Sequence, residues 1–232
     1  MSTTAPSPIP ILVVLSGPSG SGKTTLCTSF IRRHPDFSRA ITCTTRSPRQ
    51  GERNGVDYYF LQPQDFIHHI QSGDFLENAE VYNQAYGTLR KEVIGKLHAG
   101  KNVLLTVDVQ GAESIRRLCD ENRPRGEGDP PQSGRETGTL RHEIDELSRA
   151  VVSIFMVPPT LRELKNRLRK RNLDSLRTID QRLQQVTHEI EQYRNFDYLL
   201  ESGTEQHDLK VLESIVEAER RRIERCALPF RM

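Results

Sequence analysis

The chain has 232 residues, of which 28% are charged, and its formal net charge is +2. This length suffices for one well-packed domain with appendages, and the nearly balanced charge gives no general affinity for nucleic acid. No apolar run approaches the roughly 18 residues that a membrane-spanning helix needs. The four cysteines lack the spacing of a zinc site or a disulfide framework, which is typical of reduced thiols in the cytoplasm. We therefore expect a cytoplasmic protein that binds neither membranes nor nucleic acid.

The first elements in chain order surround a glycine-rich segment. Residues 1–8 are rich in Ser, Thr and Pro and predict a disordered leader. The apolar run Ile11–Leu15 predicts a buried strand, and apolar residues at helical spacing from Leu26 onward predict a helix. Between them, residues 17–25 read GPSGSGKTT, which matches the pattern GxxxxGK[ST] in the strand-to-helix setting that binds nucleoside triphosphates.

Each residue type in this phosphate loop has a chemical role. Glycines let successive backbone N–H groups face an anion, Lys23 can reach the β- and γ-phosphates, and the Thr24 hydroxyl can bind Mg²⁺. The sequence therefore predicts a site for a nucleoside triphosphate and Mg²⁺. The predicted binding residues are Gly17, Pro18, Ser19, Gly20, Ser21, Gly22, Lys23, Thr24 and Thr25.

Residues 41–88 contain few long helical periods and predict a small lobe of short strands and turns. Alternating residues over 56–60 predict one half-buried strand. Turns are marked by three glycines, Gly51, Gly55 and Gly73. We expect this lobe to be inserted into a core made of residues 9–40 and 89–232.

The core resumes with a helix around residues 93–97, which ends at Gly100, and a buried strand over 103–107. Asp108 follows directly at the carboxyl end of that strand. In parallel α/β sheets, ligands bind beyond the carboxyl ends of the strands, so we expect Asp108 to share a cleft with the phosphate loop.

The segment from Asn122 to Gly138 is rich in prolines, glycines and charged residues. Such a composition buries too little apolar surface to offset the entropy lost on ordering, so we predict a mobile insertion over about residues 120–145. A buried strand over 151–157 follows. Two capped helices are then predicted, one opened by Thr160 with Glu163 and one by Thr178 with Gln181, before a strand near 198–200 and a helix from about Asp208. This alternation of strands and helices predicts a parallel, doubly wound sheet.

Two arginines in the lobe indicate a second anion site. Arg46 and Arg49 are three residues apart beside Pro48, and Tyr58 follows within the same turn-rich segment. Two planar guanidinium groups suit a phosphate, to which a tyrosine hydroxyl can add a hydrogen bond. A solvent-exposed basic loop accounts for the arginines equally well.

At this point the chain resembles the guanylate kinase family. The resemblance rests on GPSGSGKTT, TTRSPRQGE with GVDYYF, Phe75-Leu76-Glu77, Tyr86-Gly87-Thr88 and Val107-Asp108-Val109-Gln110-Gly111, in the family's order and spacing. It implies an α/β P-loop nucleoside monophosphate kinase fold, with a GMP-binding lobe and a helical lid at about residues 162–182. It also implies transfer of the γ-phosphoryl group of ATP to GMP with Mg²⁺, by a protein that we expect to be a monomer.

The resemblance assigns roles to matching residues. It implies that Arg46, Arg49, Tyr58 and Tyr86 bind the GMP phosphate, and that Thr42, Glu77, Thr88 and Asp108 contact the base. It implies that Arg167, Arg171 and Arg182 close over the triphosphate, and that Lys23, Arg46, Arg171 and Arg182 are catalytic. The chemistry of guanine agrees, because its N1–H and N2 amine are adjacent donors that one carboxylate can accept.

The chain departs from the family pattern at three places, which concern the binding of the metal ion, the turn in the lid and the binding of adenine. Thr106 replaces an acidic residue two positions before Asp108, Lys170 and Asn172 replace lid glycines, and Ser202-Gly203 replaces an Asn-Asp pair. Two alternatives stay open: a kinase-like module that binds a phosphorylated peptide, and a P-loop kinase for another phosphate ester. Such modules typically lose the loop lysine, whereas this chain retains Lys23.

Overall fold

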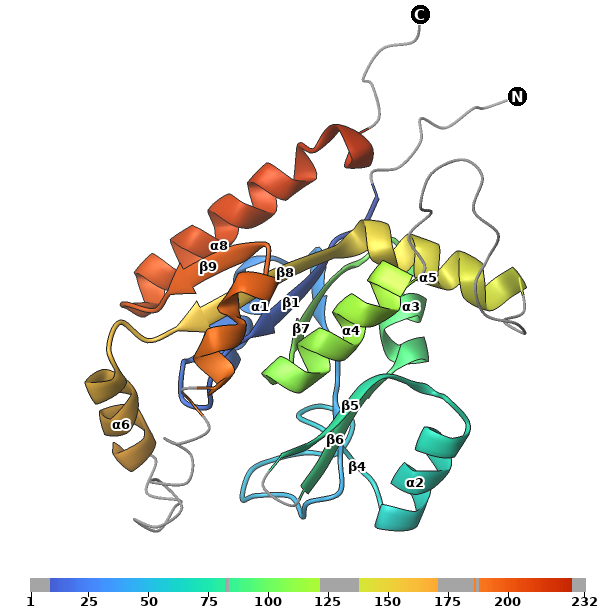
Figure 1. The fold of residues 1–232 in the computed structure, drawn as a ribbon, viewed down its shortest axis with the longest axis horizontal. Helices are drawn as coiled ribbons and strands as arrows, with labels where there is room; N and C mark the ends of the chain where they lie inside the picture. Colours follow the sequence, from blue (N-terminus) through green and yellow to red (C-terminus); the bar gives the residue numbers. More distant parts are fainter. Residues whose placement is uncertain (1–8, 82–83, 122–137, 171–185, 187, 227–232) are drawn as a thin grey trace, which may run out of the picture.

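The structure is a computed structural model that describes residues 9–81, 84–121, 138–170, 186 and 188–226. Its centre is a five-stranded parallel sheet with the strand order β2-β7-β1-β8-β9 (Figure 1). The strands are β1 (Leu12–Ser16), β2 (Phe37–Arg39), β7 (Asn102–Thr106), β8 (Val151–Val157) and β9 (Tyr198–Glu201). The predicted strands over 103–107, 151–157 and 198–200 therefore form, the first shifted by one residue and the last extended to residue 201.

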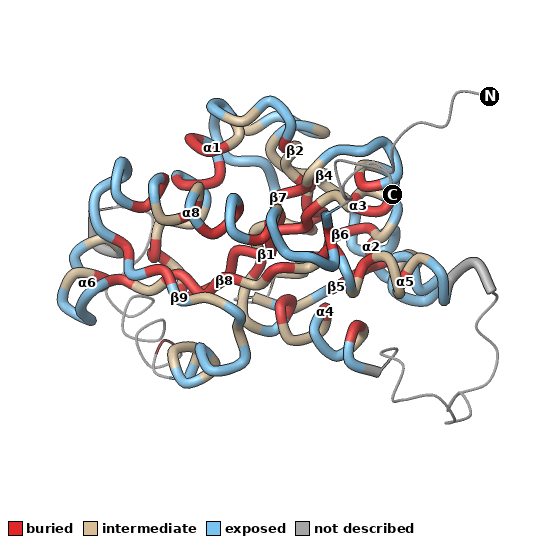
Figure 2. The backbone as a smooth tube through the Cα atoms, turned by 90° about the horizontal axis from the view of Figure 1, so that it is seen from above, coloured by how far each residue is buried: buried red, intermediate tan, exposed pale blue. Residues whose placement is uncertain are grey.

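Helices cover both faces of this sheet because successive residues of a strand point to opposite sides. On β1 and just before it, Ile11, Val13 and Leu15 pack with α1 and α8, whereas Leu12 and Val14 pack with α3, α4 and α5. The helices are α1 (Lys23–Arg33), α3 (Arg90–His98), α4 (Val109–Glu121), α5 (Gly138–Ala150) and α8 (Glu205–Arg220). Figure 2 shows buried residues following the central strands. The doubly wound α/β fold is confirmed.

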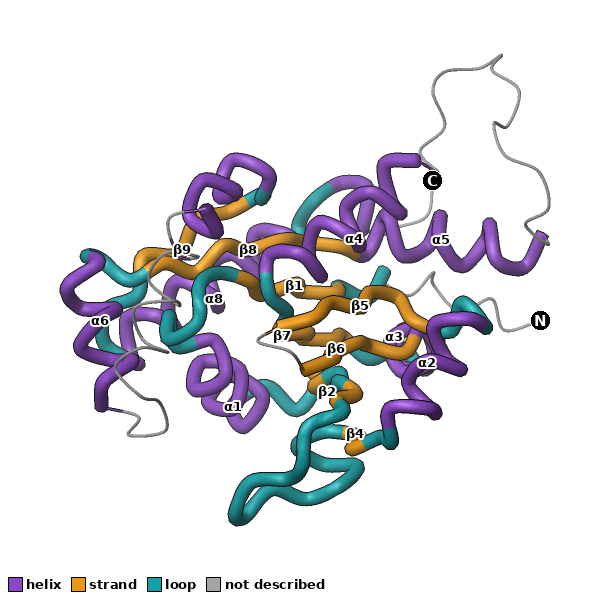
Figure 3. Tube along the Cα trace, turned by 60° about the horizontal axis from the view of Figure 1, so that its bottom comes forward, coloured by secondary structure: helices purple, strands orange, loops and turns teal. Residues whose placement is uncertain are grey.

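A second, four-stranded sheet with the order β4-β3-β6-β5 lies beside the first (Figures 1 and 3). Its elements are β3 (Cys43–Thr44), β4 (Tyr59–Phe60), α2 (Pro63–Gln71), β5 (Phe75–Val81) and β6 (Gln84–Leu89). It has its own small core, formed by Cys43, Phe66, Phe75 and Leu89. The long loop between β3 and β4 extends from this sheet, in teal at the bottom of Figure 3.

Two expectations for this region are wrong. The strand predicted over residues 56–60 forms only at Tyr59–Phe60. Its first half is a turn, in which Gly55 has a φ of +74° and donates its N–H to the Tyr58 carbonyl at 2.8 Å, so Val56 is 47% exposed. Helix α2 was not predicted at all. Pro63 occupies its first turn, where a missing N–H costs nothing, and only Phe66 of this helix is buried.

Element ends also differ from the prediction. The expected insertion over residues 120–145 is too long, because α4 ends at Glu121 and α5 begins at Gly138; the remainder lies outside the described residues. Helix α8 begins at Glu205 rather than near Asp208, since the Thr204 hydroxyl accepts the His207 N–H at 3.2 Å and caps the helix.

Helix α6 (Leu161–Lys170) begins where its capping box predicted, with the Glu163 N–H donating to the Thr160 hydroxyl at 3.0 Å. Two 3₁₀ turns, η1 (Gln192–Asn195) and η2 (Ile223–Arg225), complete the described elements. The leader, the cap at Thr178 and most of the second lid helix lie outside the described residues. Among the helices that are described, none is long and apolar enough to span a bilayer. All four cysteines are free thiols.

Gly17 gives a direct test of how the phosphate loop joins the sheet. Its φ is +131°, and a Cβ placed there would lie 2.0 Å from the Met156 carbonyl oxygen on β8. We expect Gly17→Ala to lower the free energy of unfolding by about 2–5 kcal/mol, from left-handed backbone strain and a backbone clash. Denaturant unfolding measures this loss. Gly100→Ala is the control, with a φ of +71° but no atom within 4 Å of its Cβ, so it isolates the backbone strain. Equal losses in the two variants would contradict the packing argument.

Candidate active site

The phosphate loop connects the carboxyl end of β1 to the first turn of α1. Three glycines with positive φ shape it, namely Gly17, Gly20 and Gly22. Gly22 is the N-cap of α1, which has neither a side-chain cap nor an acidic residue in its first turn. The N-terminal amides of this helix therefore have no protein anion of that kind to satisfy them, and together with the nest of loop amides they form an anion-binding site.

The Lys23 ammonium group lies over this loop. Its Nζ donates to the Gly17 carbonyl at 2.6 Å and to the Pro18 carbonyl at 3.0 Å. The charge also reaches two carboxylates across the site, because it lowers the pKa of Asp108 and of Glu189 against the larger, opposite effect of their burial. Lys23 is thus held at the loop, where a phosphate chain bound to the amides would meet it.

A cavity of about 220 Å³ joins the phosphate loop to the second sheet. Eleven of the predicted site residues line it: Gly17, Ser19, Gly20, Gly22, Lys23, Thr24, Thr42, Tyr58, Glu77, Tyr86 and Asp108. The predicted residues Pro18, Ser21, Thr25, Arg46, Arg49, Thr88 and Arg167 do not line it. Arg171 and Arg182 lie outside the described residues. The cavity therefore brings together most of the predicted loop residues and most of the predicted base contacts.

Glu77 is the most unusual residue of this cavity, because its carboxyl group is buried with only 4% of the residue exposed. A register irregularity between Phe75 and Glu77 interrupts the alternation of β5 and turns three successive residues inward. The Thr88 hydroxyl donates to Glu77 Oε1 at 2.6 Å, so Thr88 orients Glu77 from behind. Burial raises the pKa of Glu77 to about 7, and the Asp108 charge adds to the rise.

Helix α4 also approaches this carboxylate. A Cβ on Gly111 would lie 2.5 Å from Glu77 Oε2, so only glycine leaves room here. Asp108 caps the same helix, since the Gly111 N–H donates to its Oδ1 at 2.9 Å. Burial raises the pKa of Asp108, and the Gly111 hydrogen bond opposes the rise. As predicted, Asp108 stands at the carboxyl end of β7 and faces the phosphate loop's cavity.

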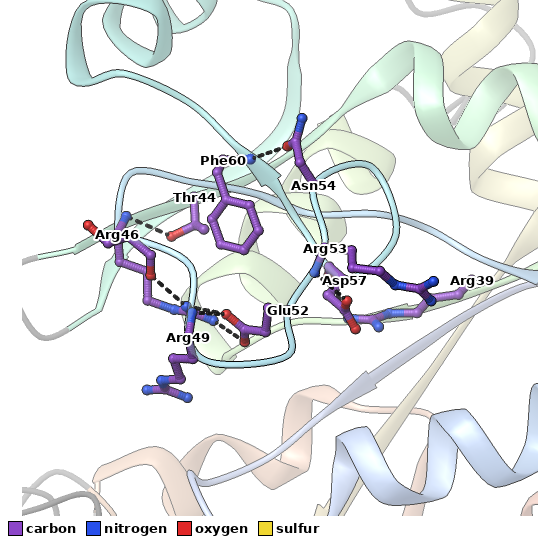
Figure 4. A network of polar contacts seen from close by, with 10 residues as sticks. Arg39, Thr44, Arg46, Arg49, Glu52, Arg53, Asn54, Asp57 and Phe60 are labelled. Atoms are coloured by element: carbon purple, nitrogen blue, oxygen red, sulfur yellow. Dashed lines mark hydrogen bonds and ion pairs between the residues drawn. The ribbon is translucent and has the colours of Figure 1, made fainter.

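Arg46 is held by a carboxylate that the sequence did not single out (Figure 4). Its Nη1 and Nη2 donate to the two oxygens of Glu52 at 2.6 and 2.7 Å. This bidentate pair raises the pKa of Arg46 and lowers that of Glu52 to about 2. The guanidinium carbon lies 4.9 Å from the ring centre of Tyr58, which lines the cavity. The Arg49 side chain extends away from the pair.

Comparison with known proteins identifies the family. The sequence model of guanylate kinase matches residues 10–123 and 139–219. The chain belongs to the guanylate kinase family. The guanylate kinase of Hahella chejuensis is 36% identical over 212 residues, which are 91% of this chain and 88% of the relative. That of Latilactobacillus sakei is 35% identical over 216 residues, 93% of this chain and 92% of the relative. A solved guanylate kinase from Anaplasma phagocytophilum superposes with a TM-score of 0.69 at 25% identity, over 94% of this chain and 90% of that one.

Arg167 joins helix α6 to the phosphate loop. Its Nη1 donates to the Ser21 carbonyl at 3.1 Å and to the Ser202 hydroxyl at 2.5 Å, while its Nε donates to Glu163 at 2.9 Å. Ser202, one of the residues that depart from the family pattern, is 1% exposed. These contacts connect Arg167 to the phosphate loop, although Arg167 does not line the cavity.

Two functional candidates were missed by reasoning from the sequence. Glu52 is the last residue of TTRSPRQGE, and an acidic residue across a proline and glycine turn from Arg46 was a usable signal. Glu189 lines the cavity from the helical segment at residues 188–191, and nothing local in the sequence pointed to it. A larger cavity of about 830 Å³ lies between α4 and η2 and contains no residue of the phosphate loop, so volume alone would have misplaced the active site.

The pair of Arg46 and Glu52 predicts an acid-sensitive contribution to stability. The pKa of Glu52 falls from 4.5 to about 2 on folding. A lowered pKa in the folded state means that the stabilisation is complete above about pH 4.5 and is lost as the pH falls toward 2. We expect Glu52→Gln to reduce the free energy of unfolding at pH 7 by on the order of 2–3 kcal/mol, and by much less at pH 3.

Denaturant unfolding at the two pH values measures this difference. Glu217→Gln is a matched control, because Glu217 is 52% exposed and pairs with Arg221 at the surface. A loss for Glu52→Gln that is the same at pH 7 and pH 3 would show that the ionic pair is not its cause.

Proposed function

We propose that this protein transfers the γ-phosphoryl group of ATP to GMP, giving ADP and GDP, in purine nucleotide metabolism. The observation that carries the proposal is the cavity, which has a phosphate loop at one end and a buried carboxylate, Glu77, at the other. Family membership supports the same reaction, since relatives covering about nine-tenths of the chain carry the name guanylate kinase. We divide the chain into a core of residues 9–40 and 89–232, a GMP lobe of residues 41–88, and a lid within the core at about residues 162–182.

Glu77 selects the base in this proposal. An ionised carboxylate accepts two hydrogen bonds from N1–H and the N2 amine of guanine. Thr42 and Asp108 line the cavity with Glu77, and Thr88 holds the carboxylate in place. Adenine offers an unprotonated N1 at the same place. It would leave a buried carboxylate unpaired, at a cost on the order of 1–3 kcal/mol or more.

We assign the GMP phosphate to Tyr58 and Tyr86, which line the cavity, and to Arg46 and Arg49 on the loop beside them. The rings of Tyr58 and Tyr86 pack edge to face with centres 6.2 Å apart, so their hydroxyls belong to one wall. Glu52 fixes the guanidinium of Arg46 against this wall before any substrate arrives. Such preorganisation lowers the cost of aligning the acceptor phosphate with the donor.

The donor end fits a triphosphate with Mg²⁺. The close approach of Gly17 to β8 and the uncapped start of α1 leave a cradle of amides, and the Thr24 hydroxyl supplies an oxygen ligand of the kind that Mg²⁺ prefers. When bound, Mg²⁺ would neutralise charge on the phosphate oxygens.

The acceptor needs no general base, because a nucleoside monophosphate with a second pKa near ~6 is already an anion at neutral pH. The task of this chain is to align two anions and to neutralise the charge between them. Lys23 acts from the donor side and Arg46 from the acceptor side, and we assign Arg171 and Arg182 of the lid to the transferred phosphate. Exclusion of water by the lid limits hydrolysis of ATP. We infer that the protein acts as a monomer in the cytoplasm, where the free thiols would stay reduced.

The first test supplies purified protein with ATP, Mg²⁺ and each nucleoside monophosphate in turn, and measures ADP and diphosphate. We expect GDP as the main product. Lys23→Ala and Arg46→Ala should each lower kcat by about 10²–10³-fold, because each removes a cation from the transferred charge. Lys210→Ala and Arg117→Ala are exposed controls on α8 and α4 and should retain the parent rate. No formation of GDP by the parent protein would refute the proposal.

The second test uses the pKa of Glu77, which is raised to about 7 by burial. Only the ionised form accepts both guanine donors, so the KM for GMP should rise as the pH falls from 8 to 6. At pH 8 the KM of Glu77→Gln for GMP should be at least tenfold higher than that of the parent. At pH 6 the two KM values should lie closer together. Since the GMP phosphate titrates equally with both proteins, their ratio isolates Glu77. A ratio that does not change with pH would show that Glu77 does not bind the base.

Unfolding of the same variant is the control for a structural effect. A raised pKa in the folded state means that Glu77 favours folding below about pH 4.5 and opposes it as the pH rises through 7. Glu77→Gln should therefore unfold at a higher denaturant concentration than the parent at pH 8, while binding GMP less tightly.

A further inference from the structure

A carboxylate of this chain lies against the donor end of the active site. Glu189 and Ser19 of the phosphate loop line the same 220 Å³ cavity. Hydrogen bonding by the Ser19 backbone N–H lowers the pKa of the Glu189 carboxyl group, against the larger effect of its burial. Its Oε2 is buried and has no hydrogen-bond partner in the described part of the chain. A half-satisfied anion is thus in contact with an amide that a bound phosphate would require.

The position of Glu189 is set by packing. Val186, on the same short segment, is buried against Leu164 of α6, and Ile190 packs on both. Helix α6 is in turn fastened to the phosphate loop through Arg167 and the Ser21 carbonyl. Glu189 is therefore anchored to the same helix that contacts the loop from behind.

The charges around Glu189 do not stabilise it fully. Burial raises its pKa, Asp108 across the cavity raises it further, and Lys23 lowers it. A phosphate chain at the loop would add negative charge to the two carboxylates that already face Lys23. Two like charges in a partly buried site repel each other more strongly than in water. Glu189 and a phosphate group therefore compete for one amide and for one cation.

We propose that Glu189 occupies the donor phosphate subsite through the Ser19 amide, and that it lowers the affinity of the loop for any phosphate chain until the chain displaces it. This makes Glu189 a positioning residue for the proposed phosphoryl transfer, because it acts through the loop. Selectivity follows. Displacing Glu189 costs free energy, which the ligand must offset with its own contacts. Inorganic phosphate and pyrophosphate make few contacts, whereas a complete nucleoside triphosphate also binds through its base and ribose.

The test measures binding of pyrophosphate and of ATP, both without Mg²⁺, by isothermal titration calorimetry. Glu189→Gln keeps the shape of the side chain and an oxygen that can accept the Ser19 N–H, but removes the charge. We expect this variant to bind pyrophosphate about tenfold more tightly than the parent, and ATP more tightly by a smaller factor. Glu191→Gln is the matched control, because Glu191 lies two residues away with a side chain that is 68% exposed, and its affinities should equal those of the parent.

A second readout observes the contact itself. The amide resonance of Ser19 in a ¹⁵N correlation spectrum should shift in Glu189→Gln, and pyrophosphate should shift it in the parent protein. Glu189→Asp, whose carboxylate is one methylene further from the loop, should also bind pyrophosphate more tightly than the parent.

If folded Glu189→Gln binds pyrophosphate as tightly as the parent or less tightly, the proposal is overturned. Weaker binding would show that Glu189 helps to bind the ligand. Thermal unfolding of the variant confirms that it is folded, and Glu189→Asp repeats the test if it is not. These measurements need neither GMP nor turnover. A parent protein that makes no GDP would refute the proposed function without affecting them, and an active parent with unchanged pyrophosphate binding in Glu189→Gln would refute only this inference.

Discussion

The contact between the backbone of Gly17 and the Met156 carbonyl is the constraint on which the site depends. A separation that excludes even a methyl group fixes the phosphate loop on the carboxyl end of β8. Because parallel strands end at one edge of their sheet, the same edge also receives Asp108 from β7. Asp108 then caps α4, whose Gly111 leaves room for the Glu77 carboxylate from the second sheet. The contact between Gly17 and Met156 therefore positions the phosphate loop at one end of the cavity, and the contacts of Asp108 and Gly111 connect that edge of the sheet to Glu77 at the other end.

The buried Glu77 carboxylate is held in this arrangement at a cost in stability. A side chain that is 4% exposed, with a pKa raised to about 7, is partly charged at neutral pH in surroundings that disfavour charge. Thr88 offsets only part of that cost. A glutamine or an apolar residue would fold more easily at the same place, but it could not accept two donors from one base. Glu77 thus differs from the pair of Arg46 and Glu52, in which each charge stabilises the other and the fold benefits.

How much of this could be predicted depended on whether the signal was local. The strand over 151–157 and the phosphate loop were predicted correctly, because a buried parallel strand is a continuous apolar run and the loop is a contiguous motif. The strand over 56–60 was predicted too long, since a turn closed by Gly55 competes with an alternating pattern. Helix α2 is only nine residues long, so its apolar residues Phe66, Ile67 and Ile70 make no long helical period, and only Phe66 of the three is buried. Glu189 could not be found, because it is distant in sequence from the loop amide that it contacts.

The cavity is lined by three carboxylates, Glu77, Asp108 and Glu189, and by Lys23, while Arg46 lies next to it over the ring of Tyr58; the protein already engages both cations. Lys23 donates to two loop carbonyls, and Arg46 is paired with Glu52. A bound anion must therefore share each of these cations with an existing partner, which weakens the attraction between the site and small anions. In the proposed function, two nucleotides overcome this by adding contacts that a simple anion lacks, the base at Glu77 among them. The charge arrangement thus favours ligands that fill both ends of the cavity, and this is the condition that alignment of a donor phosphate with an acceptor phosphate requires.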